Sequence, residues 1–194
     1  MPETYYNYVA GEWRAAETGA TFDVSNPADR SDVIGEFQQS GRGDAEAAVE
    51  AAATASEAWA DTPGPERGRI LREAGQRMAD RKDELTETLV REEGKARPEA
   101  AGEVQRAIDI FAYYAAKASD IGGTVKGSSS EDTRLYTVNE PVGVAGLITP
   151  WNYPIAIPAW KIAPALATGN TIVFKPASQA PNVSRKLVEC LDEA

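Results

Sequence analysis

Two apolar stretches decide the fold: Val142-Gly143-Val144-Ala145-Gly146-Leu147-Ile148 and Thr171-Ile172-Val173-Phe174. Continuous apolar runs of this length are typical of parallel strands buried on both faces. A helix is predicted between them, from about residue 154 to residue 167, with a late start and a kink because it contains Pro158 and Pro164. A second helix opens at Pro181. The order strand, helix, strand, helix predicts the opening of a Rossmann-like α/β sheet.

A doubly wound sheet needs more than two strands. The chain ends inside the last predicted helix, at Ala194. We therefore expect the sheet to be incomplete in this chain, which would be the N-terminal portion of a larger protein or would need a partner.

The residues before this sheet predict strands, turns and three helices. Residues 5–13 favour a short hairpin, and Asn26-Pro27-Ala28-Asp29 is a strong turn signal. Apolar spacing predicts a helix over 45–59 capped by Asp44, a second running unbroken from Pro65 to a stop at Gly94, and a third from Pro98 to residue 122. Lys95 is interpreted as a cation facing the dipole of the second helix.

Composition excludes several classes of function. The chain has 30 acidic and 20 basic residues, a net charge of −10, so nucleic acid and anionic membranes are not expected partners. With no His and the single Cys190, neither a His-activated nucleophile nor a metal site is expected. The acidic balance suggests adaptation to high salt, and the lack of a long apolar run or signal peptide favours a soluble, cytoplasmic protein.

Polar residues follow both predicted strands, where ligands bind in open α/β sheets. Asn152 offers a neutral amide, Lys175 an ammonium group and Ser178 a hydroxyl. Each has a plainer interpretation: Asn152 as a turn or cap residue, Lys175 as a solvated charge, and the nearby Trp151 as part of the core. No Gly-x-Gly-x-x-Gly follows the strand, so the ordinary dinucleotide fingerprint is missing. Cys190, among Glu189, Asp192 and Glu193 on the last helix, is interpreted as structural because acidic neighbours disfavour a thiolate.

The segments Pro150-Trp151-Asn152, Lys175-Pro176-Ala177-Ser178 and Pro164-Ala165-Leu166-Ala167-Thr168-Gly169-Asn170 resemble the NAD(P)-dependent aldehyde dehydrogenase superfamily. Supporting matches lie upstream in Asn26-Pro27-Ala28, Glu93-Gly94-Lys95, Gly102-Glu103-Val104 and Phe111-Ala112-Tyr113-Tyr114-Ala115. The resemblance therefore covers nearly the whole chain.

The resemblance implies roles for individual residues. Asn152 matches the asparagine that forms half of the oxyanion hole. Ile148, Thr149, Pro150 and Trp151 match the segment along the cofactor, and Lys175, Pro176, Ala177 and Ser178 match the segment at the adenosine ribose. Because Ser178 stands where many NAD-preferring members carry Glu, NADP is the expected cofactor, with NAD tolerated. The family's nucleophilic Cys and general-base Glu would lie beyond this chain, so this portion alone is expected to be inactive.

The resemblance also implies an organisation: strands and helices over 1–122 that pack on the cofactor domain, the start of an oligomerisation arm over 123–140, and the first part of the NAD(P)-binding domain over 141–194. It implies a homodimer or homotetramer and a small aldehyde substrate. The acidic helix 84–93 and the segment 102–107 look most like subgroups that act on 2-oxoglutarate semialdehyde or succinate semialdehyde. Two alternatives remain open: a non-catalytic nucleotide-binding or subunit-interaction protein, and a degenerate remnant.

Overall fold

The computed structural model describes residues 2–194 and has a mixed α/β fold. Its elements are β1 (Asn7–Val9), β2 (Glu12–Arg14), β3 (Thr21–Asn26), β4 (Asp29–Gln38), α1 (Arg42–Asp61), α2 (Gly64–Asp80), α3 (Lys82–Glu93), α4 (Arg97–Lys117), a 3-10 turn (Ala118–Asp120), β5 (Val125–Lys126), β6 (Leu135–Tyr136), β7 (Val144–Ile148), α5 (Ala156–Ala167), β8 (Thr171–Lys175) and α6 (Pro181–Asp192). Within the described residues the strands pair two by two, in four two-stranded sheets: β1 with β2, β3 with β4, β5 with β6 and β7 with β8.

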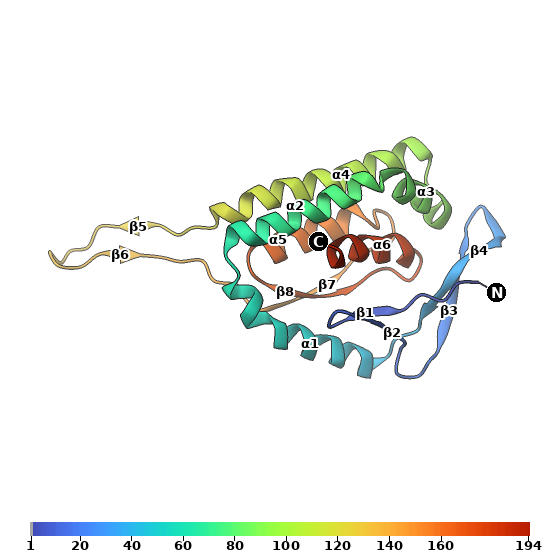
Figure 1. Cartoon of the computed structure of the whole chain (residues 1–194), viewed down its shortest axis with the longest axis horizontal. Coiled ribbons are helices and arrows are strands. Elements are labelled where there is room, and N and C mark those ends of the chain that lie inside the picture. Colours follow the sequence, from blue (N-terminus) through green and yellow to red (C-terminus); the bar gives the residue numbers. More distant parts are fainter. Residues whose placement is uncertain (1) are drawn as a thin grey trace.

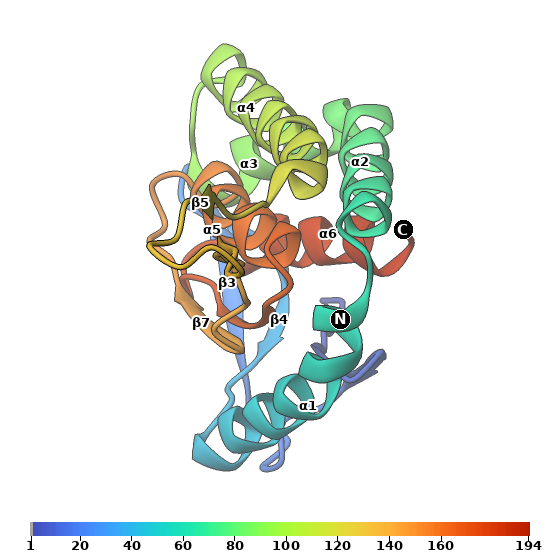
Figure 2. The ribbon, with the colours of Figure 1, turned by 90° about the vertical axis from the view of Figure 1, so that its left-hand side faces the viewer.

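The predicted strand–helix–strand–helix order is confirmed. β7 and β8 are parallel and in register, from Val144 opposite Thr171 to Ile148 opposite Lys175. α5 connects them and packs on α4, while α1 contacts both strands. In Figures 1 and 2, α2 and α4 lie beyond α5, and α1 lies away from them on the other side of β7 and β8.

The expectation that the two apolar runs are buried on both faces is wrong for the described residues. In β8 only Thr171 is buried, and residues 172–174 are half-buried. Only Leu147 of β7 is buried, and the side chain of Ile148 is 76% exposed. β7 pairs with β8 alone within residues 2–194, so its other edge carries no neighbouring strand there. A strand in this position leaves part of its apolar surface facing solvent.

The main core lies between the helices. Phe111, Leu71, Met78, Leu85 and Ile162 are completely buried in it. α2 and α4 pack closely because both present small residues: a Cβ added at Gly68 would lie 2.4 Å from the carbonyl oxygen of Ala115. A second cluster, of Val24, Ile34 and Phe37, holds the β3–β4 hairpin together.

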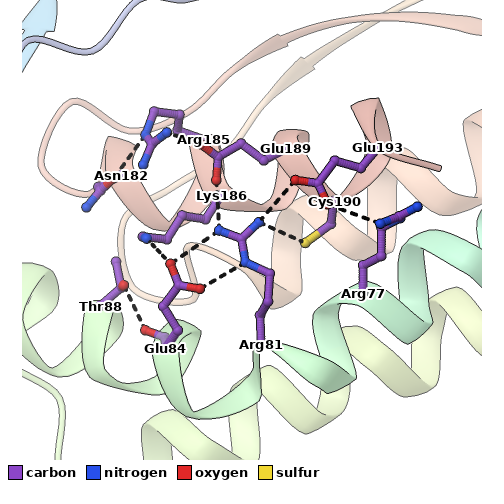
Figure 3. Close-up of polar contacts among 10 residues, drawn as sticks. All are labelled: Arg77, Arg81, Glu84, Thr88, Asn182, Arg185, Lys186, Glu189, Cys190 and Glu193. Atoms are coloured by element: carbon purple, nitrogen blue, oxygen red, sulfur yellow. Dashed lines mark hydrogen bonds and ion pairs between the residues drawn. The ribbon is translucent and has the colours of Figure 1, made fainter.

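The predicted helix over 65–94 is two helices. α2 ends at Asp80 and α3 begins at Lys82, with Arg81 between them at φ −100° and ψ 17°. The Arg81 guanidinium donates to Glu84 on α3 and to Glu189 on α6, at 2.9 Å in each case (Figure 3). Turning the chain here allows α3 to pack on both α6 and β3. The predicted stop at Gly94 is confirmed, and this residue has the left-handed φ of 81° that favours glycine.

The first long helix begins three residues before its predicted start. Gly41 precedes α1, and Asp44 is the third residue of the helix. Its carboxylate accepts a hydrogen bond from the Gly41 backbone N–H at 2.8 Å, so it caps the helix from inside rather than from the position before it. The predicted hairpin over 5–13 and the turn at Asn26–Asp29 are confirmed. None of the helices in residues 2–194 combines the length and apolarity needed to cross a bilayer.

Candidate functional site

The candidate site is the edge at which β7 and β8 end. Ile148 and Lys175 are register partners at the last position of each strand. The Thr149 N–H donates to the Lys175 carbonyl at 3.4 Å, which holds the two following segments together. The structure thus brings the two predicted groups, 148–152 and 175–178, to one edge of the sheet.

Side chains at this edge divide into buried and exposed groups. Thr149 and Ala177 are buried, whereas Asn152, Lys175 and Ser178 are exposed and available to a ligand. The Thr149 hydroxyl is buried and has no hydrogen-bond partner within the described residues. The Asn152 amide likewise has no hydrogen bond to residues 2–194. Unsatisfied polar groups beside exposed donors fit a polar ligand such as a ribose.

A hollow of about 640 Å³ lies beside this edge and is lined by both segments. Trp151 and Ser178 contribute to its wall from the strand ends, and the β3–β4 hairpin closes the opposite side. Its lining residues are Asp23, Val24, Ser25, Pro27, Glu92, Glu93, Trp151, Ser178, Gln179 and Ala180. Asp23, Glu92 and Glu93 are the acidic residues of this wall, and Trp151 adds an apolar surface to it.

Two helix N-termini near the edge are closed by carboxylates of this chain. Glu103 accepts hydrogen bonds from the N–H groups of Ile155 and Ala156 at 3.0 and 3.1 Å, at the start of α5. Glu92 accepts from the N–H groups of Asn182 and Val183 at 2.6 and 2.9 Å, at the start of α6. These are the groups that bind phosphate in ordinary dinucleotide folds. The missing glycine fingerprint and the occupied helix N-termini therefore both indicate that these two helix starts do not bind a phosphate in the ordinary dinucleotide manner.

The interpretation of Lys95 as a helix-dipole cation is incomplete. Its ammonium group pairs with Glu93 at 3.0 Å and with Glu103, and it donates to the Asn152 carbonyl at 3.1 Å. The same ammonium group lies 4.2 Å above the ring of Tyr153. Burial lowers the pKa of Lys95, but its hydrogen bonds with Glu103 and Glu93 outweigh this effect and raise it. Lys95 and Glu103 lie in the segments that carry the family resemblance, but the sequence alone does not indicate a chemical role for Glu103.

Cys190 is confirmed as a buried thiol. The pKa of the thiol is raised to about 11, and burial is the main cause. The acidic neighbours expected from the sequence contribute less, and the Arg81 guanidinium, 3.9 Å from Sγ, opposes the shift (Figure 3). Such a thiol is protonated at neutral pH and is not a nucleophile.

A family model for the aldehyde dehydrogenase family matches residues 13–194. The chain belongs to this family. It is 65% identical over its whole length to an alpha-ketoglutarate semialdehyde dehydrogenase of Haloferax volcanii and 43% identical over 98% of its length to an alpha-ketoglutaric semialdehyde dehydrogenase of Bacillus subtilis. It covers 40% and 39% of these two relatives.

Solved aldehyde dehydrogenase-like structures agree with this assignment. An NADP-dependent enzyme of E. coli superposes with a TM-score of 0.95 at 36% identity, covering 98% of this chain and 40% of that one. A 3,6-anhydro-L-galactose dehydrogenase in complex with NAP superposes with a TM-score of 0.92 at 34% identity, over 98% of this chain and 40% of that one. The fold is therefore the portion of the aldehyde dehydrogenase fold that contains a Rossmann-like NAD(P)-binding part.

Proposed function

We propose that this chain is the N-terminal portion of a semialdehyde dehydrogenase that oxidises 2-oxoglutarate semialdehyde, or a similar semialdehyde, to the carboxylate. Membership of the family and 65% identity to the Haloferax volcanii relative support this substrate class. The observation that carries the proposal is the shared edge of β7 and β8, which brings the exposed Asn152 amide to the same side as Lys175 and Ser178.

In this proposal the Asn152 amide donates a hydrogen bond to the oxyanion that develops on the aldehyde oxygen. A neutral donor suits this role because it stabilises developing negative charge without raising the affinity for other anions. We assign the roles of nucleophilic Cys and general-base Glu to residues outside these 194. When bound, NAD(P)⁺ accepts the hydride.

The proposed cofactor seat comprises Ile148, Thr149, Pro150 and Trp151 on one segment and Lys175, Pro176, Ala177 and Ser178 on the other. The orphaned Thr149 hydroxyl and the exposed Lys175 and Ser178 side chains fit a ribose and its substituents. We favour NADP over NAD because Ser178 adds no negative charge that would repel a 2′-phosphate. Replacing Ser178 with Glu should shift the ratio of NADP to NAD activity towards NAD, and an unchanged ratio would remove Ser178 from this role.

The proposed organisation keeps residues 1–122 as strands and helices packed on the cofactor domain, 123–140 as the start of an oligomerisation arm, and 141–194 as the first part of that domain. The β5–β6 hairpin projects from the body in Figure 1, and Val125 and Tyr136 on it are 83% and 74% exposed. Such apolar surface supports contact with a second subunit, in a homodimer or homotetramer. The proposed location is the cytoplasm.

The decisive assay measures NADP-dependent oxidation of 2-oxoglutarate and succinate semialdehydes by the intact enzyme that contains this chain. Asn152→Ala should lower kcat by about 10²–10³, the usual effect of losing one oxyanion donor. Asn7→Ala is the matched control and should leave kcat unchanged, because the Asn7 side-chain amide donates to the Ser40 hydroxyl at 2.8 Å, away from the ends of β7 and β8. If the protein isolated from its source has the mass of these 194 residues and no activity, a nucleotide-binding or subunit-interaction role replaces the enzymatic one.

A further inference from the structure

Asn152 lies in a segment with little other support. Between Pro150 and Asn152, the bond from Lys95 to the Asn152 carbonyl is the one hydrogen bond to the rest of the described chain. Trp151, Asn152 and Tyr153 are all exposed, and the Asn152 amide itself bonds to none of residues 2–194. The direction of that amide therefore depends on what holds its backbone.

Lys95 provides this support from a buried position. Its side chain is 10% exposed, and that of its partner Glu103 is 1% exposed. Glu103 lies on α4 and also holds the N–H groups of Ile155 and Ala156 at the start of α5. The Glu103 carboxylate thus fixes both the start of α5, which follows Asn152, and the lysine that donates to the Asn152 carbonyl.

Hydrogen bonds that do not involve Lys95 fix the chain on both sides of residues 150–153. Before Asn152, the Thr149 N–H is bound to the Lys175 carbonyl; after it, the Ser184 hydroxyl donates to the Pro154 carbonyl at 2.9 Å. Removing the Lys95 ammonium group leaves these contacts and both backbone donors to Glu103 in place. The expected consequence is local: residues 150–153 gain freedom while the starts of α5 and α6 stay fixed.

We propose that Lys95, anchored by Glu103, is a positioning residue that aims the Asn152 amide at the reacting aldehyde oxygen. This inference rests on the proposed function, since it assigns Lys95 a role through Asn152. In this role Lys95 acts through Asn152 and not directly on the substrate or cofactor. Its contribution is to keep the amide in one orientation, because a displacement of about 1 Å at a reacting centre can cost a factor of about 10² in rate.

A double-mutant cycle in the intact enzyme tests the proposal, with Lys95→Met, Asn152→Ala and the double variant. Lys95→Met should lower kcat by about tenfold to a hundredfold and leave the KM for the cofactor unchanged. On the Asn152→Ala background it should have no further effect on kcat, because the group that it positions is already gone.

Lys82→Met is the matched control. Lys82 also links α3 to α4, through a 2.7 Å hydrogen bond to Gln105, and within the described residues no hydrogen bond or ion pair joins its side chain to residues 150–153. It should leave kcat unchanged. Lys95→Arg, which keeps the charge and can still donate to Glu103 and to the carbonyl, should recover part of the lost kcat and serves if Lys95→Met folds poorly.

The outcomes separate the inference from the function on which it rests. If Asn152→Ala lowers kcat but Lys95→Met does not, or lowers it by the same factor on both backgrounds, the positioning role is overturned and the oxyanion role stands. If Asn152→Ala leaves kcat unchanged in an active enzyme, the oxyanion role of Asn152 is refuted, and the positioning role of Lys95 is refuted as well.

Discussion

Glu92 should make the stability of the protein depend on pH in a direction opposite to that of most carboxylates. It is 3% exposed, and both of its oxygens accept hydrogen bonds from the start of α6. Burial raises its pKa to about 7, against the opposing effect of those hydrogen bonds and of Arg185 and Lys186. The folded protein therefore retains a proton at pH values where the unfolded chain, with a pKa of 4.5, has lost it.

The size and sign of the effect follow from these two pKa values. Below pH 4.5 the group is protonated in both states, and its stabilising contribution is fully present. As the pH rises to 7, the folded state must give up a proton that it holds more tightly, and about 3 kcal/mol of unfolding free energy is lost. Above pH 7 the contribution is constant.

Glu92→Gln removes this titration, and Glu87→Gln, at an exposed carboxylate on the same helix, is the control. Denaturant unfolding at fixed KCl, followed by tryptophan fluorescence from pH 5 to pH 8, gives the free energy of unfolding of each protein. The free energy of unfolding of the native protein minus that of Glu92→Gln should fall by up to about 3 kcal/mol as the pH rises, and the control should track the native protein. If this signed difference stays constant or rises with pH, the backbone donors keep Glu92 ionised and the reasoning is refuted.

Three further predictions concern stability. Arg67 is 9% exposed and donates to three backbone carbonyls at the ends of α1 and α5. Arg67→Met leaves these buried acceptors unpaired and should lower the free energy of unfolding in denaturant by about 2–5 kcal/mol. A loss below about 1 kcal/mol would contradict this. Gly68→Ala places a methyl group 2.4 Å from the Ala115 carbonyl oxygen and should lower stability by about 1–3 kcal/mol in a thermal scan, whereas Gly102→Ala, with open space around it, should not. With a net charge of −10, the protein should unfold on dilution of salt and recover in concentrated KCl, and circular dichroism that is indifferent to KCl would exclude this adaptation.

Local signals in the sequence predict the elements well where the decisive interactions are also local. The run Thr171–Phe174, the turn at Asn26–Asp29 and the stop at Gly94 are each specified by residues within a few positions. The break at Arg81 is different, because no proline or glycine marks it. It depends on ion pairs with Glu189, more than 100 positions away, which helical periodicity does not register.

The same distinction applies to the candidate site. Asn152, Lys175 and Ser178 follow apolar strands, and parallel pairing brings strand ends together, so their common edge could be predicted. The link between Lys95 and the Asn152 carbonyl spans 57 positions and uses a backbone oxygen, which carries no sequence signature. The sequence pattern is therefore enough to predict the candidate site, while the contact between Lys95 and Asn152 is visible only in the three-dimensional structure.

The two carboxylates that close the starts of α5 and α6 have a consequence for folding during synthesis. Glu92 and Glu103 belong to α3 and α4, which leave the ribosome before residues 155 and 182. Starting a helix is its costly step, because several residues are ordered before the first hydrogen bond rewards them. We expect the earlier helices to present ready acceptors to each later helix as it emerges, so that translation order and assembly order coincide.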